Sequence, residues 1–471
     1  MQTNRKNHMT TVLILLILVS ALTVILASCD TGFSGNDFTN SIPNLTSKDE
    51  SSADTVSEQY TPPEGYTDRP IVMDIKNVAP DTVVISGKCE EGAKVTIEGG
   101  KQNVTVGSRN GYFIAEITLS NTTTTLLEAT AVVEDKERSE PLSFTAKYIA
   151  TAEKRKDNYR VSVGVDSQLY FDIYLDNYLG SNLLTQTNLR GFKNSINARK
   201  TNIENRARGQ DVQLVYVLVP DATTVYPEIF PSDVVRSTFT TRYEQVSSAL
   251  SETNATVIDM YETLLAAKQD GQYEIYRKND SHLTEYGAYL VYEQIANVLK
   301  VNFPEAGPRS LDEFDIKTAK SVGGDLISYL GITKENYTES VVNLVPKFSL
   351  QIGHDENSDI STVNISDVRK YKSADDFSIY NYTDPKVIGI RDRFIIRTNR
   401  EELPSAIIYR DDSVYPMIDI LSERFNNAMI ARSGDYVVNL IYASSYRTEG
   451  KTLVDYVIVI VSESNIQNIL N

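Results

Sequence analysis

Gln213-Leu-Val-Tyr-Val-Leu-Val-Pro220 is a nearly continuous apolar run close to the middle of the 471-residue chain. A strand buried on both faces of a parallel sheet has this composition, whereas a strand with one wet face alternates apolar and polar residues. Polar stretches with helical character flank the run, at 183–208 and at 232–250. Alternation of helices with a doubly buried strand predicts an α/β domain.

Four more stretches are strand candidates: Ala255-Thr-Val-Ile-Asp259, Ala406-Ile-Ile-Tyr409, Tyr436-Val-Val-Asn-Leu-Ile441 and Tyr456-Val-Ile-Val-Ile-Val461. With helices between them, they predict a mostly parallel sheet in a domain that we place at 155–471. Ligands of such sheets bind beyond the carboxyl ends of the strands, so the polar residues that follow these strands are the first candidates for a site.

The chain begins like an exported protein. Arg5 and Lys6 form a short basic head, and the apolar stretch 12–27 leads to Leu26-Ala27-Ser28-Cys29. This ending matches the lipobox of bacterial lipoproteins, which implies a signal peptide at 1–28 and a lipid on Cys29. A plain transmembrane anchor is the alternative, because 12–27 is only slightly short for a membrane span. Either attachment holds the rest of the chain outside the cytoplasm, at the bacterial cell membrane.

Two further segments separate Cys29 from the α/β domain. Residues 29–69 are rich in Ser, Thr, Asn, Asp and Pro, which predicts a disordered tether. Residues 70–150 contain short β-branched runs separated by turn signals such as Asn110-Gly111, which predicts a small all-β sandwich. Through Gly87-Lys-Cys-Glu-Glu-Gly-Ala-Lys-Val-Thr-Ile97 and Asn110-Gly-Tyr-Phe113 it resembles bacterial immunoglobulin-like (Ig-like) modules. We expect a spacer or a carbohydrate-contacting module.

Charge and composition exclude some functions. The chain has 63 acidic and 46 basic residues, a net charge of -17, and this surface repels the phosphates of nucleic acids. There are three histidines, and His8 lies within the predicted signal. Histidine chemistry therefore has two candidates, His282 and His354, and the hydrophilic surroundings of His354 favour a solvated loop.

Two segments carry residues suited to nucleophilic catalysis. In an extended loop, Asp280 and His282 project to the same side, so Asp280 can orient one imidazole nitrogen and leave the other to act as a base. Ser413 follows the strand that ends at Tyr409 and precedes a helix with Pro416 in its first turn. Backbone N–H groups at such a helix start suit an oxyanion. Taken alone, each segment also fits a solvated loop or an N-cap.

Several blocks between 158 and 471 resemble, in order, the SGNH hydrolase-like family of the alginate O-acetyltransferases AlgX and AlgJ, and most closely the bacterial DHHW-type proteins. The blocks are Gly164-Val-Asp-Ser-Gln-Leu-Tyr-Phe171, Val219-Pro-Asp-Ala-Thr-Thr-Val-Tyr-Pro-Glu228, Tyr276-Arg-Lys-Asn-Asp-Ser-His-Leu-Thr-Glu-Tyr-Gly-Ala-Tyr289, Gly323-Gly-Asp-Leu326, Tyr409-Arg-Asp-Asp-Ser413 and Asp455-Tyr-Val-Ile-Val-Ile-Val-Ser462. Asp221-Ala222 stands where the family has Asn-Lys, and Leu283 where it has Trp.

The resemblance implies a Ser413 nucleophile, a His282 base and an orienting Asp280. Family members move acetyl groups onto or off hydroxyls of extracellular polysaccharides. This implies a carbohydrate O-acetyltransferase or O-acetylesterase that acts on cell-envelope polysaccharide without a metal or cofactor. The acetyl donor is a small molecule or a partner membrane protein that transfers acetyl groups. Tyr276 and Arg277 are either substrate contacts or a surface pair.

Asp411 and Asp412 precede Ser413 directly. Two carboxylates at this place oppose an oxyanion unless one caps the helix and the other faces solvent. The competing hypothesis is a non-catalytic surface lipoprotein that binds glycan or acts as a scaffold, with a degenerate site on the same fold.

Overall fold

The computed structural model describes residues 62–152, 160–207, 211–232, 234–236, 240–348, 350–351, 353–354, 362–363, 393–398, 400–432 and 454–470. The predicted signal peptide at 1–28, Cys29, most of the tether and the strand expected at 436–441 lie outside these residues. Within them, no helix is long and apolar enough to cross a membrane.

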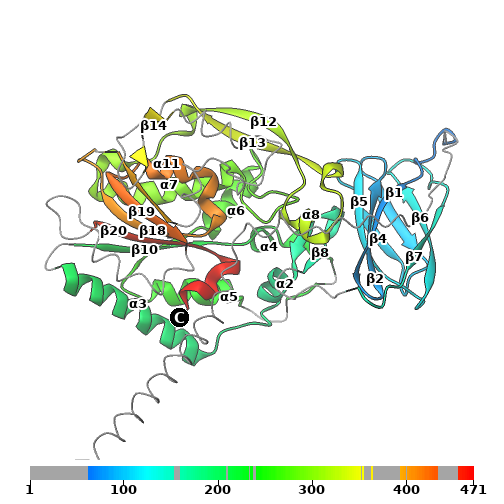
Figure 1. The fold of residues 1–471 in the computed structure, drawn as a ribbon, viewed down its shortest axis with the longest axis horizontal. Coiled ribbons are helices and arrows are strands. Elements are labelled where there is room, and N and C mark those ends of the chain that lie inside the picture. Colours follow the sequence, from blue (N-terminus) through cyan, green and yellow to red (C-terminus); the bar gives the residue numbers. More distant parts are fainter. Residues whose placement is uncertain are drawn as a thin grey trace, which may run out of the picture. The chain divides into compact units, whose positions relative to one another are not determined.

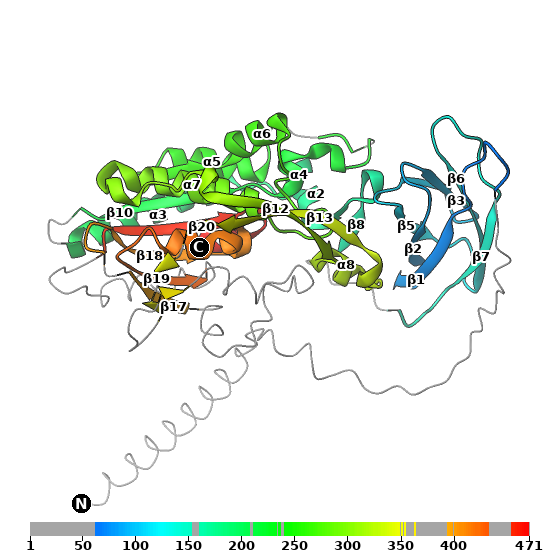
Figure 2. The ribbon, with the colours of Figure 1, turned by 90° about the horizontal axis from the view of Figure 1, so that it is seen from above.

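The N-terminal part of the described chain consists of two antiparallel sheets, coloured blue and cyan in Figure 2. One sheet has the order β1 (Ile71–Ala79), β2 (Thr82–Lys88), β5 (Tyr112–Thr118), and the other β4 (Val104–Gly107), β3 (Lys94–Glu98), β6 (Thr124–Val132), β7 (Leu142–Lys147). Alternate side chains of both sheets meet in one core around Ile85, Ile97 and Phe113. Short strands are present through this segment, as predicted. The Ig-like relationship stays a prediction.

A seven-stranded sheet forms the centre of the α/β part (Figure 1). Its order is β11 (Thr256–Asp259), β10 (Gln213–Val219), β20 (Tyr456–Ser462), β18 (Ser405–Arg410), β19 (Asn427–Arg432), β17 (Arg393–Arg397), β15 (Gly353–His354). The strands from β11 to β19 run parallel, and β17 and β15 continue the sheet antiparallel. The predicted α/β domain with a mostly parallel sheet is therefore confirmed.

The apolar run that predicted the domain is buried on both faces. Val215 and Val217 face one buried cluster, whereas Leu214, Tyr216 and Leu218 face a second one. The second cluster contains side chains of α3 (Gln186–Ala207) and α5 (Arg242–Ser251). Two layers of helices remove both faces of the strand from water, which is why its sequence does not alternate.

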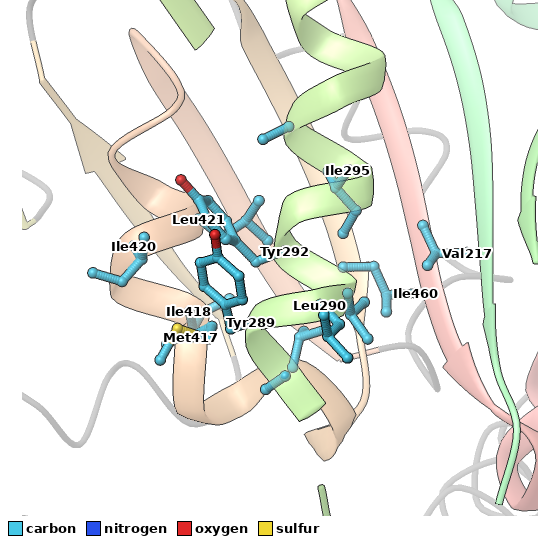
Figure 3. Close-up of a cluster of buried hydrophobic side chains, with 14 of the residues drawn as sticks. Val217, Tyr289, Leu290, Tyr292, Ile295, Met417, Ile418, Ile420, Leu421 and Ile460 are labelled. Carbon is cyan, nitrogen blue, oxygen red and sulfur yellow. The ribbon is translucent and has the colours of Figure 1, made fainter. Parts of the chain in front are cut away.

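Helix α7 (Glu285–Asn302) covers the first face. Figure 3 shows its side chains, among them Tyr292 and Ile295, between β20 and the segment that contains Met417 and Leu421. That segment comprises the 3₁₀ helix η7 (Asp412–Met417) and α11 (Ile418–Ser422). The core thus fixes the element that follows β18 against the helix that follows the Asp280–His282 loop.

Three elements that the sequence analysis did not predict surround this loop. They are the β8–β9 pair (Val161–Val163 and Leu169–Phe171), the antiparallel hairpin of β12 (Phe314–Val322) and β13 (Thr338–Pro346), and α8 (Asp325–Leu330). Val84 and Ile114 of the N-terminal sheets share a buried cluster with Leu326 and Leu330 of α8. The N-terminal sheets therefore make packing contacts that a plain spacer does not need.

Candidate active site

Backbone hydrogen bonds fix the loop that carries Asp280 and His282. Tyr276 and Leu283 form an antiparallel bridge, and the Arg277 N–H donates to the His282 carbonyl at 3.0 Å. Directly after the loop, the Thr284 hydroxyl caps α7 by accepting a hydrogen bond from the Gly287 N–H at 3.1 Å. The capped helix and the bridged ends leave the loop little conformational freedom.

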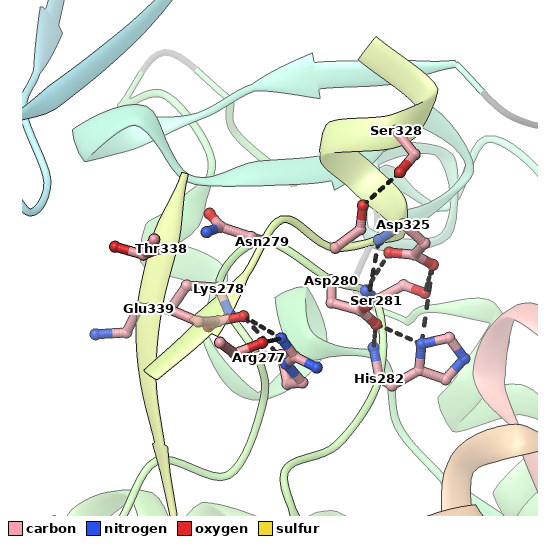
Figure 4. A network of polar contacts seen from close by, with 12 residues as sticks. Arg277, Lys278, Asn279, Asp280, Ser281, His282, Asp325, Ser328, Thr338 and Glu339 are labelled. Atoms are coloured by element: carbon pink, nitrogen blue, oxygen red, sulfur yellow. Dashed lines mark hydrogen bonds and ion pairs between the residues drawn. The ribbon is translucent and has the colours of Figure 1, made fainter. Parts of the chain in front are cut away.

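Asp280 and His282 contact each other within this loop (Figure 4). The Nδ1 atom of His282 is hydrogen-bonded to Oδ1 of Asp280. The Asp280 carboxylate also accepts hydrogen bonds from the His282 N–H at 3.1 Å and from the Asp325 N–H at 3.2 Å. Asp280 therefore fixes the imidazole through Nδ1, and Nε2 is the ring atom that can take a proton from a nucleophile.

The charges of the pair shift both pKa values. Burial opposes the charged form of His282, but the neighbouring Asp280 carboxylate outweighs this effect and raises the pKa of His282 to about 10. Burial likewise opposes the charge of Asp280, but the His282 charge and hydrogen bond lower the pKa of Asp280 overall. His282 is therefore protonated at neutral pH in the resting protein.

Asp325, the first residue of α8, was not predicted as a site residue. Its carboxylate accepts hydrogen bonds from the N–H and the hydroxyl of Ser281, and lies 3.9 Å from His282 Nδ1. Burial and the Asp280 charge raise the pKa of Asp325 to about 6. Gly324, at φ 152°, lets the chain pass close to the loop, because a Cβ there would lie 2.0 Å from the Asn279 carbonyl oxygen. The Gly-Asp pair noted at 324–325 was the local signal for this residue.

Ser413 lies in η7, just beyond the carboxyl end of β18. Asp411 caps η7, since its Oδ1 accepts hydrogen bonds from the Ser413 N–H at 3.0 Å and from the Ser413 hydroxyl at 2.5 Å. Asp412 pairs with Arg410 at 3.0 Å, and its side chain is 38% exposed. The two carboxylates thus occupy the capping and the solvent-facing positions that an oxyanion near Ser413 requires.

One expectation about this turn was wrong. We expected unoccupied backbone N–H groups beside Ser413, but the Ser413 N–H donates to the capping carboxylate. The oxygen of Asp411 competes for the same donor because Asx-type caps satisfy the first N–H groups of a helix. In this arrangement the Ser413 N–H is therefore not available as an oxyanion donor.

Ser413 and His282 line one pocket of about 440 Å³ that is partly open to solvent. It lies at the carboxyl end of the parallel strands, where residues after β10, β18 and β20 meet. The described residues that line it are Tyr174, Val219, Pro220, Asp221, Tyr276, Ser281, His282, Leu283, Asp412, Ser413, Ser462, Ser464 and Asn465. The sheet topology therefore brings the candidate nucleophile and base together from positions 131 residues apart in sequence, 413 − 282.

The side chains of Tyr276 and Arg277 lie in different surroundings, although the two residues are neighbours in the sequence. Tyr276 lines the Ser413 pocket, and its hydroxyl donates to the Pro220 carbonyl at 2.6 Å. The Arg277 guanidinium is directed away from Ser413, to Glu339 of β13 at 2.7 Å and to the Ser321 hydroxyl of β12 at 2.7 Å. Its side chain is 1% exposed, so Arg277 is placed to hold the loop on the β12–β13 hairpin.

A second carboxylate pair, which was not predicted, lies beneath the pocket. The Oε2 atom of Glu463 accepts hydrogen bonds from the Asp221 N–H at 3.0 Å and from the Thr224 hydroxyl at 2.6 Å. Asp221 Oδ2 and Glu463 Oε1 are buried and have no hydrogen-bond partner among the described residues. Burial and the charge of Glu463 raise the pKa of Asp221, and burial raises the pKa of Glu463 to about 7.

Asp280, His282 and Asp325 each offer one atom that could bind a cation, and these atoms lie within 4.8 Å of one another. Two carboxylate oxygens and an imidazole nitrogen suit several divalent metals. His282 offers its Nδ1 to Asp280, which is the arrangement of an oriented base. The absence of a metal requirement stays a prediction.

The matched family agrees with the resemblance inferred from the sequence. Residues 166–362 match the SGNH hydrolase-like domain of the acetyltransferase AlgX. The family resemblance is thereby confirmed for this segment, which contains Asp280, His282 and Asp325. Ser413 lies beyond the matched residues, so its assignment rests on the geometry of the pocket.

One known relative and two solved structures are similar to parts of this chain. The "Probable alginate O-acetylase AlgJ" of Pseudomonas syringae is 30% identical over 122 residues, which span 26% of this chain and 30% of that relative. Bacillus cereus PatB1 with a sulfonyl adduct is 16% identical at a TM-score of 0.46, covering 65% of this chain and 96% of PatB1. A DHHW family protein from Eubacterium siraeum is 12% identical at a TM-score of 0.41, covering 73% and 94%.

Proposed function

We propose that the protein is a lipid-anchored, extracytoplasmic carbohydrate O-acetyltransferase or O-acetylesterase that acts on cell-envelope polysaccharide. The observation that carries this proposal is the common pocket of Ser413 and His282, with His282 held by Asp280. The match of residues 166–362 to an acetyltransferase domain supports the same reaction class.

The reaction consists of two acyl transfers through Ser413. Nε2 of neutral His282 accepts the Ser413 proton while Oγ attacks the acetyl carbonyl, and the donor leaves with that proton from His282. The acetyl-serine is then attacked by a sugar hydroxyl, whose proton passes to His282 and returns to Ser413 Oγ. Attack by water instead gives acetate, which is the esterase reaction.

The place of the reaction follows from the N-terminus. A lipid on Cys29 and a tether at 29–69 hold the domain near the membrane outside the cytoplasm. The polysaccharide and any partner that donates acetyl groups must then lie within reach of the tether. Cys29→Ser removes the acylated thiol, so lipid labelling of the wild-type chain but not of this variant is expected.

The catalytic test is acetyl release from p-nitrophenyl acetate by the full chain in detergent, compared with Ser413→Ala. We expect the variant to lose at least about 99% of the rate, since removal of a nucleophile costs orders of magnitude. Ser251→Ala is the control, because Ser251 is an exposed serine at the end of α5 and does not line the pocket. Mass spectrometry of the reacted protein is expected to find the acetyl group on the peptide that contains Ser413.

Equal rates for the wild type and Ser413→Ala would support the non-catalytic glycan-binding or scaffold protein. Two features favour that second candidate: Ser413 Oγ donates to Asp411, and the Asp280 charge raises the pKa of His282. If the rates differ, addition of an acceptor glycan distinguishes an O-acetyltransferase from an O-acetylesterase. A transferase gives acetylated glycan, and an esterase gives acetate alone.

A further inference from the structure

We propose that the acceptor is a glycan whose sugar rings carry no carboxylate, and that a ring binds against Tyr226 beside the Ser413 pocket. This inference rests on the proposed function and adds the substrate class. It separates this protein from enzymes whose acceptor is a polyuronate.

The first argument is the charge of the Ser413 pocket. Asp412 lines it, and neither Lys nor Arg is among its described lining residues. Asp221 also lines it, but burial and Glu463 raise its pKa and so favour its uncharged form. Asp411 lies directly beside Ser413, and Asp280 and Asp325 lie beside His282. A protonated His282 offsets only one of these carboxylate charges, and none when it is neutral and acts as the base. A uronate at the acceptor position would face several carboxylates at short range.

The second argument is that nearby cations are already paired. Arg410 is 1% exposed and pairs with Asp412, while Arg277 is equally buried and pairs with Glu339. Lys278 pairs with Glu274 at 2.7 Å. Recognition of a carboxylate uses an Arg or Lys whose donors reach the ligand, and here the two buried arginines are paired with protein carboxylates.

The third argument is the buried carboxylate pair beneath the pocket. Asp221 is on the pocket wall and contacts Glu463 through its N–H, and an oxygen of each carboxyl group has no partner among the described residues. The protein thus already bears the cost of placing two acidic groups together away from water. Another carboxylate at this wall would increase that cost.

The fourth argument is the apolar surface that an uncharged ring would contact. A neighbouring pocket of about 470 Å³ shares Tyr174, Tyr276 and Ser281 with the Ser413 pocket. Its described lining residues also include Tyr170 and Tyr226, whose ring meets that of Tyr276 edge to face at 6.1 Å, and the paired Arg277 and Lys278. Tyr170, Tyr174 and Tyr276 are buried, so the half-buried Tyr226 is the tyrosine whose ring can contact the C–H groups of a sugar.

The test uses pairs of oligosaccharides that have the same linkage and length, one of them neutral and the other a uronate. Calorimetry first measures their binding to Ser413→Ala, so the result does not depend on catalysis. We expect the neutral member to bind about tenfold more tightly at low ionic strength, and the ratio to fall as salt screens the charges. Asp412→Asn removes one pocket carboxylate and is expected to lower the ratio of the two affinities, neutral over uronate, several-fold.

Tighter binding of the uronate, a ratio that salt does not change, or no binding of either member in any pair would overturn the inference. These outcomes differ from failure of the proposed function, which is the absence of acetyl on Ser413 in the wild type. The rates of acetyl transfer from the wild-type acetyl-enzyme to the two oligosaccharides of a pair are then compared. We expect the same preference for the neutral member in these rates. Faster transfer to the uronate would also overturn the inference.

Discussion

His282 has to lose a proton before it can accept one from Ser413. Because the Asp280 charge holds the pKa of His282 at about 10, acylation of Ser413 is expected to become faster as the pH rises towards 10. Asp280→Asn removes that charge, so the pKa of His282 should fall towards its ordinary value and the profile should move to lower pH. We expect a lower maximum as well, because Asn does not stabilise the imidazolium formed in the reaction.

The measurement is the pH dependence of the initial release of p-nitrophenol, with the rate of Ser413→Ala subtracted at each pH as the background. Asp270→Asn, an exposed substitution at the end of α6 (Tyr261–Asp270), is the control and should keep the wild-type profile. An unchanged midpoint in Asp280→Asn would show that Asp280 does not set the proton affinity of the base.

At the residue scale, local contacts could be predicted and distant contacts could not. The two-residue spacing of Asp280 and His282 and the capping position of Asp411 are both local features of the sequence. The partners Asp325, Glu339 and Glu463 lie far along the chain from the groups they bind. Arg277 was expected as a substrate contact or a surface residue, because the sequence does not reveal that Glu339 approaches it.

The β12–β13 hairpin acts as a support for the site loop. Glu339 accepts hydrogen bonds from the Arg277 side chain and from the Lys278 N–H at 2.7 Å. Glu339→Gln would leave the buried Arg277 charge without a counter-ion, and we expect the free energy of unfolding to fall by about 3 kcal/mol. Glu335→Gln, an exposed change between the two strands, is the control. Urea unfolding measures both, and equal stabilities would contradict the assigned role of the pair.

At the element scale, the sequence predicted the strands whose composition reflects burial on two faces. β10, β18 and β20 are apolar except at their ends, and the predicted bounds differ from the observed ones by one or two residues at most. β12 was not found, since most of its side chains are exposed or half-exposed and only its pairing with β13 identifies it as a strand. Pairing between distant segments leaves no periodic signal when neither face is clearly apolar.

At the scale of the whole molecule, the N-terminal sheets contact the loop that carries the candidate base. The Arg109 guanidinium donates to Oδ1 of Asn279 at 2.9 Å, and to the Lys278 carbonyl at 3.4 Å. Asn110 donates to the Thr338 carbonyl of β13 at 3.1 Å. Asn279 directly precedes Asp280, and Thr338 directly precedes Glu339. The N-terminal sheets therefore touch both supports of the site.

If these contacts position the base, Arg109→Ala should slow catalysis although Arg109 is not in the Ser413 pocket. Loss of the bond to Asn279 lets the loop shift, and a small displacement of Asp280 and His282 is expected to lower kcat for p-nitrophenyl acetate about tenfold. KM should change little, because no residue that lines the pocket is altered.

Arg138→Ala is the matched control, since Arg138 lies on the same sheets and donates only to Thr130 among the described hydrogen bonds. An unchanged kcat in Arg109→Ala would restrict the N-terminal sheets to the role of a spacer. A fall in kcat without a matching fall in the thermal midpoint would make them part of the catalytic unit.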